Sequence, residues 1–234
     1  MLPDTALKDL PYQGIPLDLM NDAASCPVAN PGLASARAGA PLRALLRHAT
    51  ETPHQRLDSH FARMTEAPDA SDYHRFIRMS HACHMAIEPV LAQMAQRLDD
   101  PLLARRQSLL PMLSQDMRAM GLAPVLMEPL ALYRPDLPEA AGLIYVLDGS
   151  RLGARFIHRE FITKDLTRRW PGITTAYLAG ASGPDAFGER MTALSGRVIS
   201  ETARQRALAA AQSAFALFEA AFAWAARNPE AATS

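Results

Sequence analysis

The stretch from Gly142 to Ile157 constrains the fold most, because it has the pattern of a helix but carries glycines in its interior. Its apolar residues recur at helical offsets, which predicts a helix over about residues 138–163. Gly149 and Gly153 lie four residues apart and therefore on one face of that helix. A glycine inside a helix costs about 0.8–1 kcal/mol relative to alanine, so the pair costs roughly 2 kcal/mol. Either another helix backbone approaches closely there or a flat ligand lies against bare backbone, and the stretch itself leaves both open.

The chain from Pro41 onwards keeps a helical period, and no run alternates with period two for long enough to make a strand. A helix is predicted from about 41 to 61 with a kink at Pro53, and a second from the N-cap Ser71 to 98 with an interruption at Pro89. A third is predicted from 101 to 120, where Gly121 ends it. A short helix should follow Pro124, and most of 185–227 should be helical. This pattern predicts an all-α fold, a single-domain helical bundle over residues 41–228. Residues 1–40, which include five prolines, are expected to form an irregular N-terminal arm, and residues 229–234 a C-terminal tail.

The composition excludes several classes of partner. Lys plus Arg and Asp plus Glu both total 24, and this balance argues against nucleic acid or an anionic membrane as a partner. Two cysteines, Cys26 and Cys83, cannot build a disulfide framework and suit a reducing compartment. No apolar run approaches the ~18–20 residues that span a bilayer, and the N-terminus lacks the pattern of a secretory signal. We therefore expect a soluble cytoplasmic protein with no membrane partner.

Among the seven histidines, His54 stands out because of its neighbours. Asp58 follows one helical turn later, so its carboxylate can accept the N–H of one ring nitrogen and raise the basicity of the other. Arg47 lies two turns before His54 and is placed to meet an anionic part of a ligand. Such a set would suit haem, with iron on the histidine and a propionate beside the arginine.

A competing site is formed by His81 and His84, three residues apart with Cys83 between them. They could share a metal ion, but no second carboxylate–histidine set supports a di-iron bundle. A polar helix face with Cys83 buried is the simpler interpretation. The chain has no dinucleotide fingerprint, phosphate loop or nucleophile elbow, so any electrons must come from another protein.

Three segments resemble the haem oxygenases. Residues 45–58, Leu-Leu-Arg-His-Ala-Thr-Glu-Thr-Pro-His-Gln-Arg-Leu-Asp, resemble their first helix, in which Thr-x-x-x-His carries the proximal iron ligand. Residues 145–154, Tyr-Val-Leu-Asp-Gly-Ser-Arg-Leu-Gly-Ala, resemble the distal helix, in the form found in the bacterial enzymes that supply biliverdin to bacteriophytochromes. Residues 214–219 are similar to the last helix, and the resemblance covers about residues 41–225.

The resemblance implies a haem-oxygenase-like bundle with haem between a proximal and a distal helix. On the proximal side it makes His54 the iron ligand, Asp58 its hydrogen-bonding partner and Arg47 the cation beside a propionate. Basic residues of the late helices that contact propionates in some relatives have no clear match here. Arg190 and Arg197 are candidates, although a plain surface charge is the simpler interpretation of each.

On the distal side the resemblance places Gly149 and Gly153 over the haem face, where missing side chains leave room for dioxygen. Ser150 stands where many relatives have an aspartate that orders distal water, and the bacteriophytochrome-linked type resembles this chain in having serine there. Ala154 replaces the second glycine of the usual pair and adds one methyl group near the pocket.

The activity that the resemblance implies is oxidative cleavage of haem, both cofactor and substrate, to biliverdin, carbon monoxide and ferrous iron. Dioxygen, electrons from an external reductase or ferredoxin, and a bacteriophytochrome as biliverdin acceptor are the implied reactant and partners. Ala154 and the thin set of propionate-binding residues leave a haem-binding or delivery protein without turnover as an alternative. A third alternative is a related helical fold with a non-haem ligand, in which the glycines only pack helices.

Overall fold

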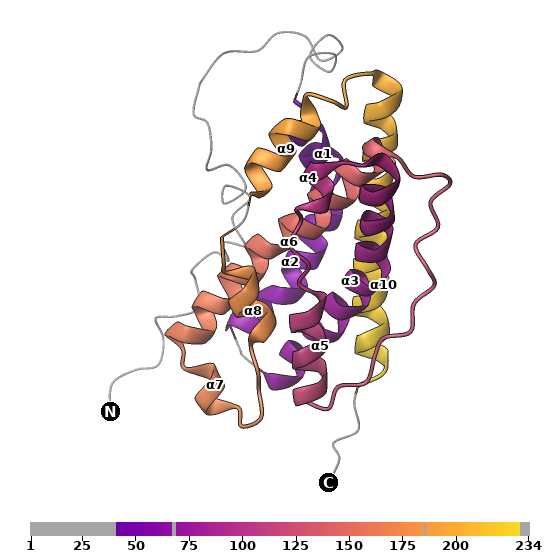
Figure 1. Cartoon of the computed structure of the whole chain (residues 1–234). Helices are drawn as coiled ribbons and strands as arrows, with labels where there is room; N and C mark the ends of the chain where they lie inside the picture. Colours follow the sequence, from indigo (N-terminus) through magenta and orange to yellow (C-terminus); the bar gives the residue numbers. More distant parts are fainter. Residues whose placement is uncertain (1–40, 67–68, 185, 230–234) are drawn as a thin grey trace.

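The computed structural model of the chain describes residues 41–66, 69–184 and 186–229, and these residues form helices joined by irregular segments (Figure 1). No strand occurs within these ranges, which confirms the all-α prediction. The predicted N-terminal arm and nearly all of the predicted tail lie outside the described residues. The helices are α1 (Leu42–Ala49), α2 (Glu51–Glu66), α3 (Ala70–Leu98), α4 (Pro101–Ala104), α5 (Leu110–Ala119), α6 (Leu137–Thr163), α7 (Leu166–Arg169), α8 (Ala176–Ala181), α9 (Phe187–Ser195) and α10 (Glu201–Arg227).

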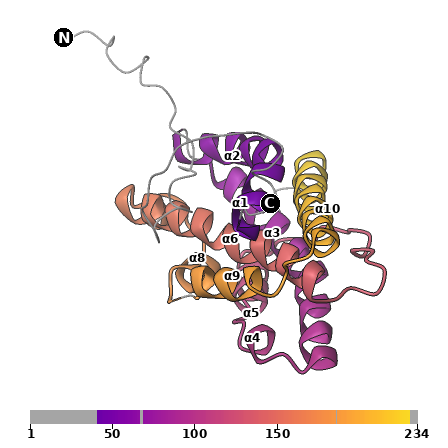
Figure 2. The same ribbon diagram turned by 90° about the horizontal axis from the view of Figure 1, so that it is seen from above.

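Helix α6 is the central element of the bundle and matches the glycine-containing helix that the sequence predicts. A capping box fixes its start, since Asp136 accepts from the N–H of Leu137 and Glu139 accepts from the N–H of Asp136. All residues from 139 to 149 are buried. The helix packs against α3, α8, α9 and α10, and it lies in the middle of the bundle when seen from above (Figure 2).

Helix α6 approaches the backbone of α10 closely at Gly142. A Cβ atom there would lie 2.1 Å from the carbonyl oxygen of Ala207 and 2.9 Å from the nitrogen of Ala211, both in α10. Close helix packing therefore explains Gly142, a glycine two turns before the pair that the sequence singles out.

The first predicted helix is divided in two. Helix α1 ends at Thr50, whose hydroxyl donates to the carbonyl oxygen of Leu46 over 2.7 Å, and α2 begins at the next residue. Pro53 therefore lies in the first turn of α2, where a backbone N–H has no partner within the helix, so the expected kink is replaced by a break.

Helix α3 runs without interruption through Pro89, contrary to prediction. Extensive burial along α3 offsets the one backbone hydrogen bond that proline removes. Its N-cap is Asp69 and not Ser71, because the Asp69 carboxylate accepts from the N–H of Ser71 over 2.9 Å.

The predicted helix over 101–120 is also divided, into α4 and α5. The connection is held to α3 through Glu88, which accepts from the N–H of Leu109 and from the hydroxyl of Ser108. Gly121 has a positive φ of 66°, as expected for the residue after a helix, but no helix follows Pro124.

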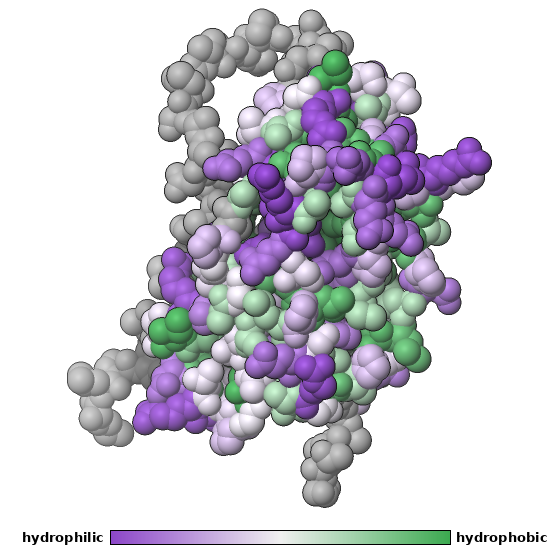
Figure 3. Space-filling view, viewed as in Figure 1, coloured by the Kyte–Doolittle hydropathy of each residue, from purple (hydrophilic) through white to green (hydrophobic). Residues whose placement is uncertain are grey.

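Within the described residues one helix, α10, is long and apolar enough to cross a membrane by length and composition alone, contrary to the expectation from the sequence. Several of its small and aromatic side chains, among them Ala211, Ala214 and Phe215, are buried, and the helix packs against α6 and α3. A core helix passes the same test of composition. On the face of the molecule drawn in Figure 3, hydrophilic and hydrophobic residues are interspersed.

Candidate functional site

A narrow pocket lies between α2 and α6, and α3, α8 and α10 complete its walls. It encloses about 800 Å³ of space free of atoms, the open mouth included, with room of about 80 Å³ for water-sized molecules. Most of the wall is apolar, including Leu57, Phe76 and Phe218, and few polar groups interrupt it. An apolar concave pocket with few polar groups is typical of a small-molecule site.

The wall from α2 carries His54 in the first two turns of the helix. Its Nδ1 lies 2.9 Å from Oδ2 of Asp58, an ion-pair distance, although the angle at the nitrogen falls outside hydrogen-bond geometry. The ring packs 5.9 Å from that of Phe215. Because Nδ1 faces the carboxylate, Nε2 is the nitrogen left for a ligand of the pocket. The structure brings these two residues together in the pocket wall as predicted, and their roles stay predictions.

The wall from α6 carries Gly149, Ser150, Gly153 and Ala154. Both glycines of the pair thus belong to the pocket, which favours the ligand explanation for them over helix packing. The Ser150 hydroxyl donates to the carbonyl oxygen of Leu147 over 2.7 Å. The Ala154 side chain is fully buried, so its methyl group forms part of the wall.

Arg47 does not line the pocket, so the structure does not bring it into the wall with His54. It lies near Tyr145, a wall residue of α6. Burial raises the pKa of Tyr145, while a hydrogen bond with Thr50 and the guanidinium groups of Arg43 and Arg47 oppose that rise. Arg47 is therefore close enough to a lining residue to act on it electrostatically, but it is not part of the lining.

Among the pocket residues that the sequence analysis did not single out are two with hydroxyl groups, Tyr177 in α8 and Ser80 in α3. Tyr177 is buried, and burial raises its pKa to about 12 although hydrogen bonds with Ser150 and Ser80 oppose the rise. Its hydroxyl is therefore protonated at neutral pH. No motif marks either residue, and only the folding of α8 back onto α6 brings Tyr177 to the pocket.

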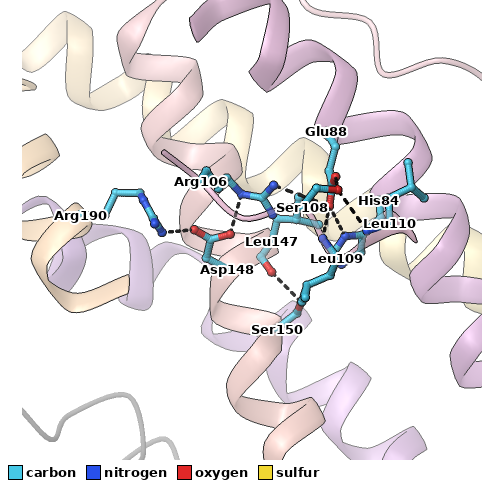
Figure 4. Close-up of polar contacts among 10 residues, drawn as sticks. All are labelled: His84, Glu88, Arg106, Ser108, Leu109, Leu110, Leu147, Asp148, Ser150 and Arg190. Carbon is cyan, nitrogen blue, oxygen red and sulfur yellow. Dashed lines mark hydrogen bonds and ion pairs between the residues drawn. The ribbon is translucent and has the colours of Figure 1, made fainter. Parts of the chain in front are cut away.

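A buried network of charged groups joins α3, α6 and α9 close to Ser150 of the pocket (Figure 4). Asp148 accepts from Nε of Arg106 over 2.7 Å and from Arg190 over 2.5 Å. Arg106 also lies 3.6 Å from Glu88, which bonds to the ring of His84. Each charged group of the network thus has a partner of opposite charge.

The network corrects the prediction of surface charge at Arg190, because that side chain is buried in the ion pair with Asp148. Arg197 is half exposed, but it pairs with Asp100 over 2.6 Å. Neither arginine lines the pocket, so neither takes the place of a propionate-binding residue there.

The competing histidine site does not form a metal centre in the part of the chain that the structure describes. No group of three or more His, Cys, Asp or Glu side chains there could hold a metal ion. Cys83 is buried, as the simpler interpretation expected. His84 is buried as well, so the predicted polar face is wrong at that residue.

The pocket fits haem in three respects. One wall offers a histidine nitrogen, the opposite wall offers glycine backbone, and the remaining lining suits a flat and largely apolar ring.

Comparison with known proteins agrees with this site. No family model matches the chain. The heme oxygenase of Xanthomonas campestris pv. campestris (strain 8004) is 34% identical over 172 residues, which cover 68% of this chain and 93% of that protein. The structure of the NO- and CO-bound heme oxygenase from Neisseria meningitidis superimposes with a TM-score of 0.61 at 21% identity, over 83% of this chain and 95% of that one, and shows the same fold. The chain belongs to the haem oxygenase family.

Proposed function

We propose that the chain binds haem between α2 and α6 and cleaves it oxidatively to biliverdin, carbon monoxide and ferrous iron. Dioxygen and electrons from an external reductase or ferredoxin are the further requirements. One observation carries the proposal: His54 and the glycines 149 and 153 line the same apolar slot from different helices.

His54 would hold the iron through Nε2, because its other ring nitrogen faces Asp58. The Asp58 carboxylate, 2.9 Å from Nδ1, favours the tautomer with the proton on that nitrogen. Bound haem would supply both the redox-active metal and the ring that is opened.

The residues of α6 shape the other side. Gly149 and Gly153 have no side chain to fill the space where dioxygen must fit. Ser150 and Tyr177 place hydroxyl groups in an otherwise apolar wall. Apolar neighbours exclude bulk water, so these few hydrogen bonds act in a medium of low dielectric constant, where they are strong.

The form of the α6 motif, with serine at position 150, supports a bacteriophytochrome as the acceptor of biliverdin. The free thiol of Cys83 supports a reducing cytoplasm as the location. Both are parts of the proposal.

Haem titration of the purified protein tests the proposal, with His54→Ala as the variant and His48→Ala, an exposed histidine of α1, as the matched control. We expect a Soret band that depends on His54 but not on His48, and its replacement in air by the red absorption of biliverdin once ascorbate or a ferredoxin and its reductase is added. A His54-dependent Soret band that persists under these conditions would identify a haem carrier without turnover. Absence of any Soret shift would refute haem binding.

A further inference from the structure

Helix α8 carries Tyr177 to the pocket but cannot hold its own position. It has six residues, and its N-cap Thr175 makes no side-chain capping bond. A helix this short is not stable by itself in water. The N–H groups of its first turn and the carbonyl groups of its last turn have no partners within the helix. Other elements of the fold must therefore fix both ends of α8.

The start of α8 is fixed by Asp116 of α5. Oδ1 of this carboxylate accepts from the N–H of Ala176 over 2.9 Å, and Oδ2 accepts from the N–H of Tyr177 over 2.8 Å. The Asp116 side chain is buried, so water does not compete for these two bonds. The carboxylate thus acts as a capping residue, although it comes from a different helix. Since one of the two N–H groups belongs to Tyr177, the cap acts directly on the pocket residue.

The end of α8 is fixed by two arginines of α6. Nε of Arg155 donates to the carbonyl oxygen of Ala181 over 2.8 Å, and Nη2 donates to that of Gly183 over 2.6 Å. Arg151, one turn earlier and therefore on the same face, donates to the carbonyl oxygen of Gly180 over 3.4 Å. A planar guanidinium holds two carbonyl groups in a fixed geometry that a lysine cannot reproduce. The α6 wall of the pocket is thereby tied to α8.

Tyr177 is the residue through which α8 reaches the pocket lining. Its hydroxyl hydrogen-bonds with Ser150 of α6 and with Ser80 of α3, and its ring centroid lies 6.0 Å from that of Phe76. Tyr177 therefore bridges α3 and α6 at the pocket wall. The pocket is narrow, with about 80 Å³ of room for water-sized molecules, so a small shift of this ring changes how a flat ligand can lie.

We propose that Asp116 and Arg155 are positioning residues for haem cleavage: they fix the two ends of α8, and Tyr177, held in place by them, limits how the haem ring is rotated in the pocket. The proposal rests on the proposed function and adds a determinant of specificity to it. Proximity decides which bridging carbon of the ring is opened, so the rotation of the ring decides which isomer of biliverdin forms. Neither Asp116 nor Arg155 lines the pocket, so each acts on the ligand through α8.

The cap at Asp116 can be tested without haem, by hydrogen exchange of backbone amides followed by NMR. The first N–H groups of an uncapped helix exchange almost as fast as those of an unfolded chain, whereas those of Ala176 and Tyr177 should be protected. Asp116→Asn keeps one oxygen as an acceptor and turns an NH2 group towards the other N–H, so the protection of one of these amides should fall about tenfold. Exchange of both wild-type amides as in an unfolded chain would overturn the proposal.

The effect on the reaction is measured as the isomer composition of the biliverdin formed, after separation by chromatography. In Asp116→Asn and in Arg155→Lys the ratio of minor isomers to the main isomer should rise about fivefold, the factor that one average hydrogen bond represents. The Kd for haem should stay unchanged. A purely structural role would lower the amount of folded protein and leave the isomer composition as in the wild type.

Two matched controls separate this effect from general destabilisation. Asp100→Asn removes a similar buried cap, which accepts from the N–H groups of Leu102 and Leu103 in α4, away from the pocket lining. Arg159→Lys changes an exposed arginine one turn after Arg155 in the same helix. Both variants should keep the wild-type isomer composition.

A wild-type isomer composition in both Asp116→Asn and Arg155→Lys would refute the positioning role, and so would an equal shift in Asp100→Asn. Arg155→Lys serves alone if Asp116→Asn does not fold. A wild-type protein that binds no haem would refute the proposed function, and with it the effect on the reaction, but would leave the exchange result standing.

Discussion

Replacing Gly142 with alanine tests the contact that fixes α6 against α10. The added Cβ would lie 2.1 Å and 2.9 Å from two backbone atoms of α10, both below the 3.0 Å that real Cβ atoms essentially never undercut. Because these are atoms of the Ala207 and Ala211 backbone, no side-chain rotation relieves the overlap and the helices must move apart. The whole length of α6 is affected, including the part that lines the pocket.

Overpacking of this kind costs about 3 kcal/mol, and alanine returns about 1 kcal/mol of helix propensity. We therefore expect Gly142→Ala to lower the free energy of unfolding by about 2 kcal/mol and Tm by about 4–8 °C in a chain of this size. Urea unfolding followed by circular dichroism measures the change.

The matched control is Gly188→Ala in α9, where an added Cβ meets no atom within 4 Å. That variant should be as stable as the wild-type protein or more stable by up to about 1 kcal/mol. If Gly142→Ala were as stable as Gly188→Ala, the close approach of α6 and α10 would not hold in solution.

Three further predictions concern buried ionisable groups. Asp148→Asn leaves Arg106 and Arg190 short of a counter-charge in the interior and should lower the free energy of unfolding by about 3–5 kcal/mol; a loss below about 1 kcal/mol would contradict the network. Because the folded-state pKa of Glu88 is depressed from 4.5 to about 2, its stabilising contribution is complete above pH 4.5 and lost as pH falls towards 2, so Glu88→Gln should flatten this part of the stability profile. His84 is buried and neutral with a pKa below its usual 6.5, so acid below that pH should favour the unfolded state, and His84→Phe should remove that slope.

The sequence predicted α6 well because its signals are local. Apolar periodicity and the proline at position 138 place its start within one residue of the observed Leu137, and its end at Thr163 agrees. The break between α4 and α5 had no such signal, because Ser108 and Leu109 are held by Glu88, about twenty residues earlier in the chain. Contacts of this range cannot be read from residue spacing.

The residues of the candidate site also fall into two groups, those with a local sequence signal and those placed by contacts between distant segments. His54 and Asp58 are one turn apart on one helix, so their contact follows from spacing alone. Tyr177 reaches the pocket only through the return of α8, and Arg190 becomes a buried partner of Asp148 only through the packing of α9 on α6. Charge by itself favoured a surface position for Arg190, and the tertiary structure overrides that preference.

The two long walls of the pocket differ in how firmly the rest of the protein holds them. Residues 139–149 of α6 are buried on every side, whereas six of the ten residues from 51 to 60 in α2 are exposed, and α2 begins afresh after Thr50. Backbone amides of α6 should therefore exchange with solvent only on global unfolding, and those of α2 through local opening. If so, a ligand should enter and leave through local opening at α2, at a rate independent of the stability of the whole fold. The histidine that would hold the iron thus sits on the more exposed of the two walls.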